Sequence, residues 1–382
     1  MSKILVAILL ITFEFGAVAQ VYNPNINKSL SELNRNVNLI KAFETFGIKS
    51  PGSQSKTNTY HWLTKSYSDF GYDSIRTDSF LIDGTIARNL VVTKPGLSDS
   101  YIVVCGHYDT RGGPGASDNG SGVVAIMETA RIMQNLSTER GVVFIHFDHE
   151  EDGFKGSNHY VSQVLGATMD ANLYMVLNID QIGGSKGQID NDKIKCERDE
   201  ENSPNTNNAL SWLLTDTIAA LCRLYTTLTP EVSTAFLSDY VPFEQQGYVI
   251  TGLYQSAPDV FAHSTADTLG NMDTTSYNQA VRLSAAAAIH FAQVQKFTSV
   301  ATPDKPRLSI YPNPVQSTVY IHSSEVLRAM KLLDLRGRTI QENQINNISL
   351  SFDVHDLAPG CYLIQVETKA GMMLNSTLVI QR

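Results

Sequence analysis

Clusters of basic residues are missing from this 382-residue sequence. Its 29 lysines and arginines are outnumbered by 38 aspartates and glutamates, which gives a net charge of −9. Proteins that bind nucleic acid through its phosphates gather Lys and Arg on one face. We therefore expect no nucleic-acid partner. A site rich in carboxylate metal ligands would contribute to such an acidic excess.

Cysteine is scarce as well, with four in the whole chain. That number is too low for a dense disulfide framework. Cys105 lies in an apolar run and is expected to be a buried thiol. Cys196 and Cys222 could pair, and Cys361 lies far away in a different segment. The chain is nevertheless long enough to bury at least one sizeable apolar core.

Long apolar runs occur only at the N-terminus, in MSKILVAILLITFEFGAVAQ. A basic Lys3, an apolar stretch over 4–13 and small residues near Ala19 are typical of a secretory signal peptide, and the stretch is too short to span a bilayer. We predict a signal peptide over 1–19, export from the cytoplasm and no transmembrane segment.

Short apolar runs then alternate with helical patterns. RNLVVTKPG, YIVVCGH, GVVFIHFDHE and LYMVLNIDQIG are β-branched, and the last three suit strands buried on both faces. SGVVAIMETARIMQNL and ALSWLLTDTIAALCRLY have apolar residues at helical spacing, and a closing helix is expected to end near Phe297. This alternation predicts an α/β domain over 20–298, with a mostly parallel central sheet flanked by helices.

The character of the chain changes after this domain. A polar, proline-containing linker is expected over 299–306. Residues 307–382 alternate apolar and polar positions between turn signals, as in LSIYPNPV, TVYIHSS and GCYLIQVET. The pattern predicts a small all-β domain, a sandwich, at the C-terminal end.

Acids and histidines follow several of the predicted strands. The stretch GHYDTRGGPGASDNGSG comes directly after an apolar strand, and its glycines let the backbone turn tightly. In an open α/β sheet, functional groups collect at the carboxyl ends of the strands. The candidates at these ends are His107, Asp109, Asp118, Glu150, Glu151, Asp180 and His263. Each alone has an ordinary explanation as a cap, a turn or a solvated strand end, but their recurrence at successive strand ends favours one site.

The chemistry of this set points to zinc. Imidazole together with carboxylates suits Zn²⁺, whereas oxygen ligands alone would suggest Mg²⁺ or Ca²⁺. The number of ligands suggests two ions, with a bridging carboxylate between them. Adjacent residues of an extended segment point to opposite sides, so Glu150 and Glu151 are expected to do different jobs. One would bind metal, and the other would accept a proton from a water whose pKa zinc lowers toward about 7.

The segments RNLVVTKPG, GHYDT, GASDNGSG, FDHEEDGFKGS, NIDQIG and HSTADTLGNMD resemble, in order and spacing, the secreted bacterial di-zinc aminopeptidases of the leucyl aminopeptidase type. The resemblance covers about 85–295. It implies that His107 and Glu151 bind one zinc, that Asp180 and His263 bind the other, and that Asp118 bridges them. It also implies the following: Glu150 is the general base, Asp109 orients His107, and the Asp118–Asn119 peptide is cis.

Four residues depart from that family pattern. Asp148 and His149 stand where relatives often have small residues. His149 could be a spare metal ligand or a donor to one, but we expect it to be a surface histidine. Gln181 replaces a common methionine, and Tyr240 replaces the histidine of a familiar SDH motif. These changes bear on substrate specificity more than on catalysis.

The tail resembles a second family. LSIYPNPVQSTVYI, LLDLRGRTI and the final FDVHDLAPGCYLIQVETKAGMMLNSTLVIQR are similar to a type IX secretion C-terminal sorting domain, over about 305–382. This implies passage through the periplasm to the cell surface or medium, with the secretion machinery as a partner. An adhesion or carbohydrate-binding sandwich is the alternative.

The sequence therefore predicts a secreted zinc aminopeptidase acting on peptides. One alternative is a glutaminyl cyclase with a single zinc; the short EEDGFKGS segment favours the peptidase. A second is a non-catalytic surface binding protein, which would have no need of Glu150. A carboxypeptidase would need a residue to bind a substrate carboxylate, for which Arg111 is the lone candidate.

Overall fold

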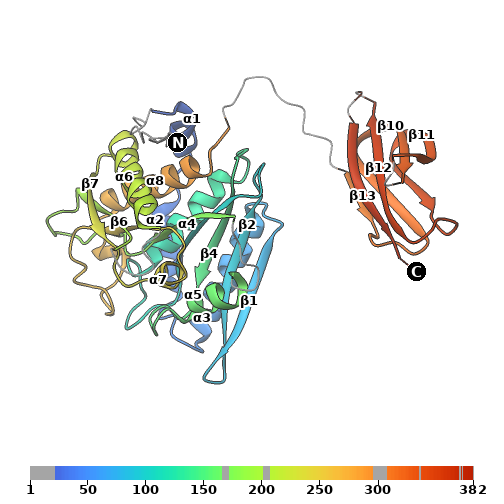
Figure 1. Ribbon diagram of the computed structural model, residues 1–382. Helices are drawn as coiled ribbons and strands as arrows, with labels where there is room; N and C mark the ends of the chain where they lie inside the picture. The colour runs from blue at the N-terminus through green and yellow to red at the C-terminus, as the bar shows by residue number, and fades with distance from the viewer. Residues whose placement is uncertain are drawn as a thin grey trace, which may run out of the picture. The chain divides into compact units, whose positions relative to one another are not determined.

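The computed structural model describes residues 22–165, 172–200, 207–295, 308–334, 337–369, 371 and 373–381 (Figure 1). The chain divides into two compact units, the first up to residue 296 and the second from residue 297. The signal peptide predicted over 1–19 and the linker predicted over 299–306 lie outside the described residues.

An eight-stranded sheet runs through the first unit in the order β1-β2-β4-β3-β5-β8-β6-β7. Its strands are β1 (Ile75–Ile82), β2 (Thr85–Lys94), β3 (Tyr101–His107), β4 (Gly141–Phe147), β5 (Leu173–Ile179), β6 (Lys193–Arg198), β7 (Thr229–Thr234) and β8 (Ile250–Gln255). The central strands β4, β3, β5 and β8 run parallel to one another. The antiparallel pairs β1–β2, β2–β4 and β8–β6 flank this centre. The predicted α/β fold is thus confirmed, with a parallel centre and mixed edges.

Helices cover both faces of this sheet (Figure 1). They are α1 (Pro24–Leu30), α2 (Asn36–Thr45), α3 (Gln54–Asp69), α4 (Gly120–Met133), α5 (Lys155–His159), the π-helical turn η1 (Tyr160–Leu165), α6 (Asn208–Tyr225), α7 (Val241–Gln245), the 3₁₀ turn η2 (Leu269–Asn271) and α8 (Thr274–Phe291). Of these, α4 contacts α8 and α2, and α6 contacts α8. The last helix ends at Phe291, six positions before the expected end, and Gln293 beyond it adopts a left-handed φ of 56°.

The central strands are buried on both faces, as their apolar runs predict. In β3, Ile102 and Val104 belong to the core beneath α2, α4 and α8, whereas Val103 and Cys105 belong to the core on the opposite face, near α7 and η1. Successive side chains of a strand point to opposite faces of the sheet. A strand that is covered on both faces therefore has apolar residues along its whole length. This burial fixes the strands whose ends carry the candidate site.

The second unit contains β9 (Leu308–Tyr311), β10 (Thr318–Leu333), β11 (Thr339–Asp353), β12 (Gly360–Thr368) and β13 (Met373–Ile380). All its strand pairs are antiparallel. The first part of β10 pairs with β9 and the last part pairs with β12, with a register shift between His322 and Leu327. One apolar core therefore lies within the curled sheet, lined by residues from both parts of β10.

All four cysteines are free thiols, so Cys196 and Cys222 do not pair. Cys105 is buried, as expected from its apolar run. Among the described residues, no helix has the length and apolar character needed to cross a membrane.

Candidate metal centre and active site

The carboxyl ends of the parallel strands converge on one edge of the sheet. His107 ends β3, Glu150 and Glu151 follow β4, and Asp180 follows β5. His263 comes from the loop after β8. Because β4, β3, β5 and β8 are parallel neighbours, their ends lie side by side. The structure therefore brings together side chains that are up to 156 positions apart in the sequence.

Two histidines face this group of carboxylates from opposite sides of Asp118. His107 Nε2 lies 3.4 Å from Asp180 Oδ1, 3.5 Å from Asp118 Oδ1 and 3.8 Å from Glu150 Oε2. His263 Nε2 lies 3.0 Å from Asp118 Oδ2 and 3.0 Å from Glu151 Oε2. Among the described carboxylates, Asp118 is the one that lies within 3.5 Å of both imidazoles.

These distances favour a different pairing from the one that the resemblance implied. His107 was expected to share an ion with Glu151, and His263 with Asp180. In the structure His107 lies near Asp180 and His263 lies near Glu151. His107, Asp118 and Glu151 also offer ligand atoms within 4.8 Å of one another, so the expected pairing of His107 with Glu151 stays a prediction. The pairing depends on which loops meet above the sheet, and strand order alone does not reveal it.

The donor set fits metal ions. Asp118 Oδ2, Glu151 Oε1 and Asp180 Oδ1 are buried oxygens that accept no well-formed hydrogen bond among the described residues, although imidazole nitrogens lie 3.0 Å from the first and 3.4 Å from the last. Burial raises the pKa of Glu150 to about 10. The nearby His107 opposes this rise, and the negative charge of Asp180 adds to it. Burial likewise raises the pKa of Glu151 to about 7 and that of Asp118, since charged carboxylates are costly away from water. A cation among them would supply the missing counter-charge.

Asp109 holds the segment that carries the glutamates. Its Oδ1 accepts a hydrogen bond from the backbone N–H of Glu150 (3.1 Å), and its Oδ2 accepts one from that of Glu151 (3.3 Å). His107 Nδ1 lies 3.1 Å from the main-chain carbonyl of Asp109 and 3.6 Å from its carboxylate. Asp109 thus contacts both the histidine and the glutamate loop.

Asp267 supports the loop that carries Asp118. Its two carboxylate oxygens accept the backbone N–H groups of Ser117 (2.7 Å) and Asp118 (3.0 Å). The peptide between Asp118 and Asn119 is cis, as the resemblance implied. A Cβ at Gly113 would overlap the carbonyl oxygen of Ser264, so this loop can pack against the His263 loop only with glycine there.

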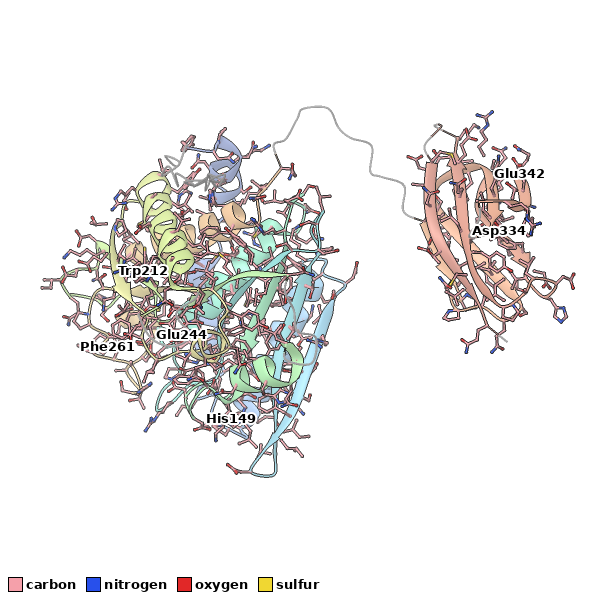
Figure 2. The ribbon with its side chains drawn as sticks, viewed as in Figure 1. His149, Trp212, Glu244, Phe261, Asp334 and Glu342 are labelled. Atoms are coloured by element: carbon pink, nitrogen blue, oxygen red, sulfur yellow. The ribbon has the colours of Figure 1, made fainter. Side chains whose placement is uncertain are left out.

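Three departures from the family pattern have structural consequences. His149, labelled in Figure 2, was expected at the surface, but it is 2% exposed; its Nδ1 lies 2.9 Å from Asp152 Oδ2. The chain folds it inward because it adopts a left-handed φ of 57° immediately before Glu150. Gln181 also has a left-handed φ, 46°, and its Oε1 accepts a hydrogen bond from Tyr254 Oη (2.6 Å).

Tyr240, the third of these departures, forms a hydrogen bond to a buried acid. Its hydroxyl donates to Glu197 Oε2 (3.0 Å) and accepts the backbone N–H of Phe236 (2.6 Å). Burial raises the pKa of Glu197 to about 8. Sequence reasoning did not single out Glu197, since a lone acid in a short strand carries no motif. Asp267 was also missed as a functional residue, although it lies within HSTADTLGNMD.

A cleft of about 570 Å³ opens over the candidate centre. Its lining residues are His107, Arg111, Asp118, Glu150, Glu151, Gly153, Phe154, Asp180, Gln181, Glu197, Phe236, Leu237, Ser238, Tyr240, Tyr254 and His263. Six of the seven predicted site residues line it; Asp109 lies behind them. Carboxylates and histidines thus form one part of the cleft, and mainly aromatic, polar and apolar residues form the rest.

Residues 89–288 match the model of peptidase family M28. This match covers more than half of the chain, which therefore belongs to that family. Residues 309–381 match the model of a secretion system C-terminal sorting domain, which indicates export from the cell or display on its surface.

Curated relatives share parts of this chain. A probable leucine aminopeptidase 2 of Aspergillus fumigatus is 34% identical over 106 residues, which are 28% of this chain and 21% of that protein. Aminopeptidase YwaD of Bacillus subtilis is 25% identical over 201 residues, 51% of this chain and 42% of that protein. The matches span less than half the length of these relatives.

Solved structures share the fold. The LapA aminopeptidase of Legionella pneumophila superposes with a TM-score of 0.62 at 21% identity, covering 78% of this chain and 81% of that one. A glutaminyl cyclase of Porphyromonas gingivalis superposes with a TM-score of 0.55 at 18% identity, covering 67% and 97%. At these identities the likeness concerns the fold, and the chemistry has to be argued from the site.

Proposed function

We propose that this protein is a secreted metallo-aminopeptidase that removes N-terminal residues from peptides at a two-zinc site. The observation that carries the proposal is the pair of histidine–carboxylate contacts on opposite sides of Asp118. His107 with Asp180 would hold one ion, His263 with Glu151 would hold the other, and Asp118 would contact both. When bound, zinc lowers the pKa of a coordinated water toward about 7 and polarises a carbonyl group.

Glu150 is the general base in this proposal. It lines the cleft, and its Oε2 is 3.8 Å from His107 Nε2, a longer separation than those of the four proposed ligand contacts. A carboxylate at this position accepts a proton from the attacking water and delivers it to the leaving amine. Asp109 keeps Glu150 and Glu151 in place through their backbone N–H groups. The proposal thus gives the two adjacent glutamates separate roles, Glu151 as a metal ligand and Glu150 as the base.

The match to a sorting domain supports export of this activity from the cytoplasm. We infer that the chain crosses the periplasm and that the type IX secretion machinery recognises its second unit, which matches a secretion sorting domain. Peptides outside the cell would then be the substrates.

The test uses the purified protein and a set of peptides that differ in their first residue, glutamine included. Mass spectrometry follows the products with and without a zinc chelator, and elemental analysis counts zinc per chain. We expect stepwise loss of N-terminal residues, abolished by the chelator and restored by zinc, with two zinc ions per chain.

Two other results would each replace the proposal. Loss of ammonia confined to the glutamine peptides, with one zinc per chain, would identify a glutaminyl cyclase. Unchanged peptides in the presence of bound zinc would favour a binding protein.

A further inference from the structure

A buried acid faces the substrate cleft opposite the candidate metal ligands. Glu197 lies on β6, is 1% exposed and lines the cleft that contains His107 and Asp180. Its Oε2 accepts a hydrogen bond from the Tyr240 hydroxyl (3.0 Å), and its Oε1 is buried with no hydrogen-bond partner among the described residues. The carboxylate can therefore accept at least one further hydrogen bond.

The neighbouring strand leaves room for this carboxylate. Gly252 on β8 pairs with Glu197 on β6, and a Cβ at Gly252 would collide with Glu197 Oε2 and crowd the ring of Tyr240. Glycine at this position keeps the acid and the tyrosine side by side. Tyr240 directly precedes α7. Strands β6 and β8 and the start of α7 thus hold Glu197 in one orientation.

The surrounding wall accommodates positive charge. Lys195 precedes Glu197 by two positions on β6, so the two side chains leave the strand on the same face. The Lys195 ammonium lies 4.7 Å from the centre of the Phe236 ring and 5.5 Å from that of Tyr254. Both rings line the cleft, and aromatic faces attract cations.

A buried carboxylate with an unpaired oxygen is costly unless a donor or a counter-charge reaches it. None of the candidate metal ligands is hydrogen-bonded to Glu197, whose side-chain bond is to Tyr240. Lys195 supplies a nearby positive charge that opposes the raised pKa of Glu197, but its ammonium lies over the aromatic rings and leaves Glu197 Oε1 without a hydrogen-bond partner among the described residues. A substrate group that enters the cleft can reach that oxygen. A cation there would favour the charged form of the acid, whose pKa burial raises to about 8. The chemistry that matches a carboxylate beside aromatic rings is a long side chain ending in an ammonium or guanidinium group.

Building on the proposed aminopeptidase activity, we propose that Glu197 selects peptides whose N-terminal residue is lysine or arginine. Gln181 adds to this polar character, since its amide replaces an apolar side chain at the cleft and is held by Tyr254. Glu197 is a specificity-determining residue in this view and takes no part in bond cleavage.

The test compares two substrates of equal length, an N-terminal lysine peptide and its norleucine counterpart, which lacks the ammonium group. A leucine peptide serves as the general substrate. For the zinc-loaded protein we expect kcat/KM for lysine to exceed that for norleucine by on the order of tenfold or more. In Glu197→Gln, which keeps the shape and an acceptor for Tyr240, we expect the lysine value to fall by on the order of 30-fold. The norleucine and leucine values should change by less than about threefold.

Glu244→Gln is the matched control, because Glu244 (labelled in Figure 2) is also a buried acid but does not line the catalytic cleft. It should leave the lysine preference unchanged. The role of Glu197 would be overturned if Glu197→Gln lowered kcat/KM equally for all three peptides, or if the wild type preferred norleucine to lysine. In either case, hydrolysis of the leucine peptide would still support the aminopeptidase activity. Failure of the wild type to cleave any of the three would overturn the proposed function and the Glu197 proposal together.

Discussion

The two units of this chain differ in whether they bury charged side chains. The first buries many ionisable side chains, among them Asp118, Asp180, Glu197 and Asp239. In the described part of the second unit, the buried polar residues are Ser323 and Thr368, and no charged side chain is buried. Figure 2 labels Asp334 and Glu342 in that unit; both are in ion pairs with exposed or half-exposed partners.

The difference shows what a reactive site demands of a fold. Burying carboxylates without counter-charge costs free energy. The second unit buries no charged side chain in its described part and does not bear that cost. Left-handed non-glycine residues also occur at the site: His149, Gln181 and His263 all have positive φ. Such residues cost about 1–3 kcal/mol each and persist where the surrounding structure holds them. The second unit has no such residue in its described part.

The largest effect is expected from Glu150→Gln. The substitution keeps the size of the side chain and removes its ability to accept a proton, so kcat for peptide hydrolysis should fall on the order of 10³-fold. Zinc content and the thermal melting temperature should stay close to those of the wild type. Retention of more than a tenth of the wild-type kcat would show that Glu150 is not the base.

Lys56→Met should strongly destabilise the first unit. Lys56 Nζ lies 2.7 Å from Asp148 Oδ1, with side-chain exposures of 6% and 1%. Removing the cation leaves the Asp148 carboxylate buried and unpaired, so the free energy of unfolding should drop by about 3–5 kcal/mol. Urea denaturation followed by circular dichroism measures this change. A loss below about 1 kcal/mol would mean that burial of charge in this unit is less costly than the comparison implies.

The smallest effect is expected from Arg328→Ala in the second unit. Arg328 Nη1 lies 3.1 Å from Glu367 Oε1, but the side chains are 65% and 31% exposed. Water already solvates both charges, so the free energy of unfolding should change by less than about 1 kcal/mol. The same denaturation experiment on the same chain provides the comparison with Lys56→Met. Equal effects of the two substitutions would remove the contrast between the units.

Much of the site was predictable because apolar runs mark buried parallel strands and polar residues follow them directly. His107, Glu150, Glu151 and Asp180 were all found in this way, and the structure brings them together. The edge strands β1 and β7 and the strand β6 beside β7 were not predicted, since IRTDSFLI, KIKCER and TPEVST lack a continuous apolar run. Glu197 was missed along with its strand.

Other features depended on contacts between loops. Asp267 acts through the backbone N–H groups of Ser117 and Asp118, about 150 positions earlier in the chain, and no local pattern reports such a bond. His149 looked like a surface residue, because polarity gives no hint that a left-handed φ turns it inward.

The sequence by itself determined the α/β character of the first unit, the β character of the second and the residue types at the strand ends. These follow from apolar periodicity and from chemistry that is local in the chain. Only the tertiary structure decided which histidine lies beside which carboxylate, and which buried acid faces the cleft. Those relations are set by the order of strands in the sheet and by the packing of loops distant in sequence, where many arrangements satisfy the same local preferences.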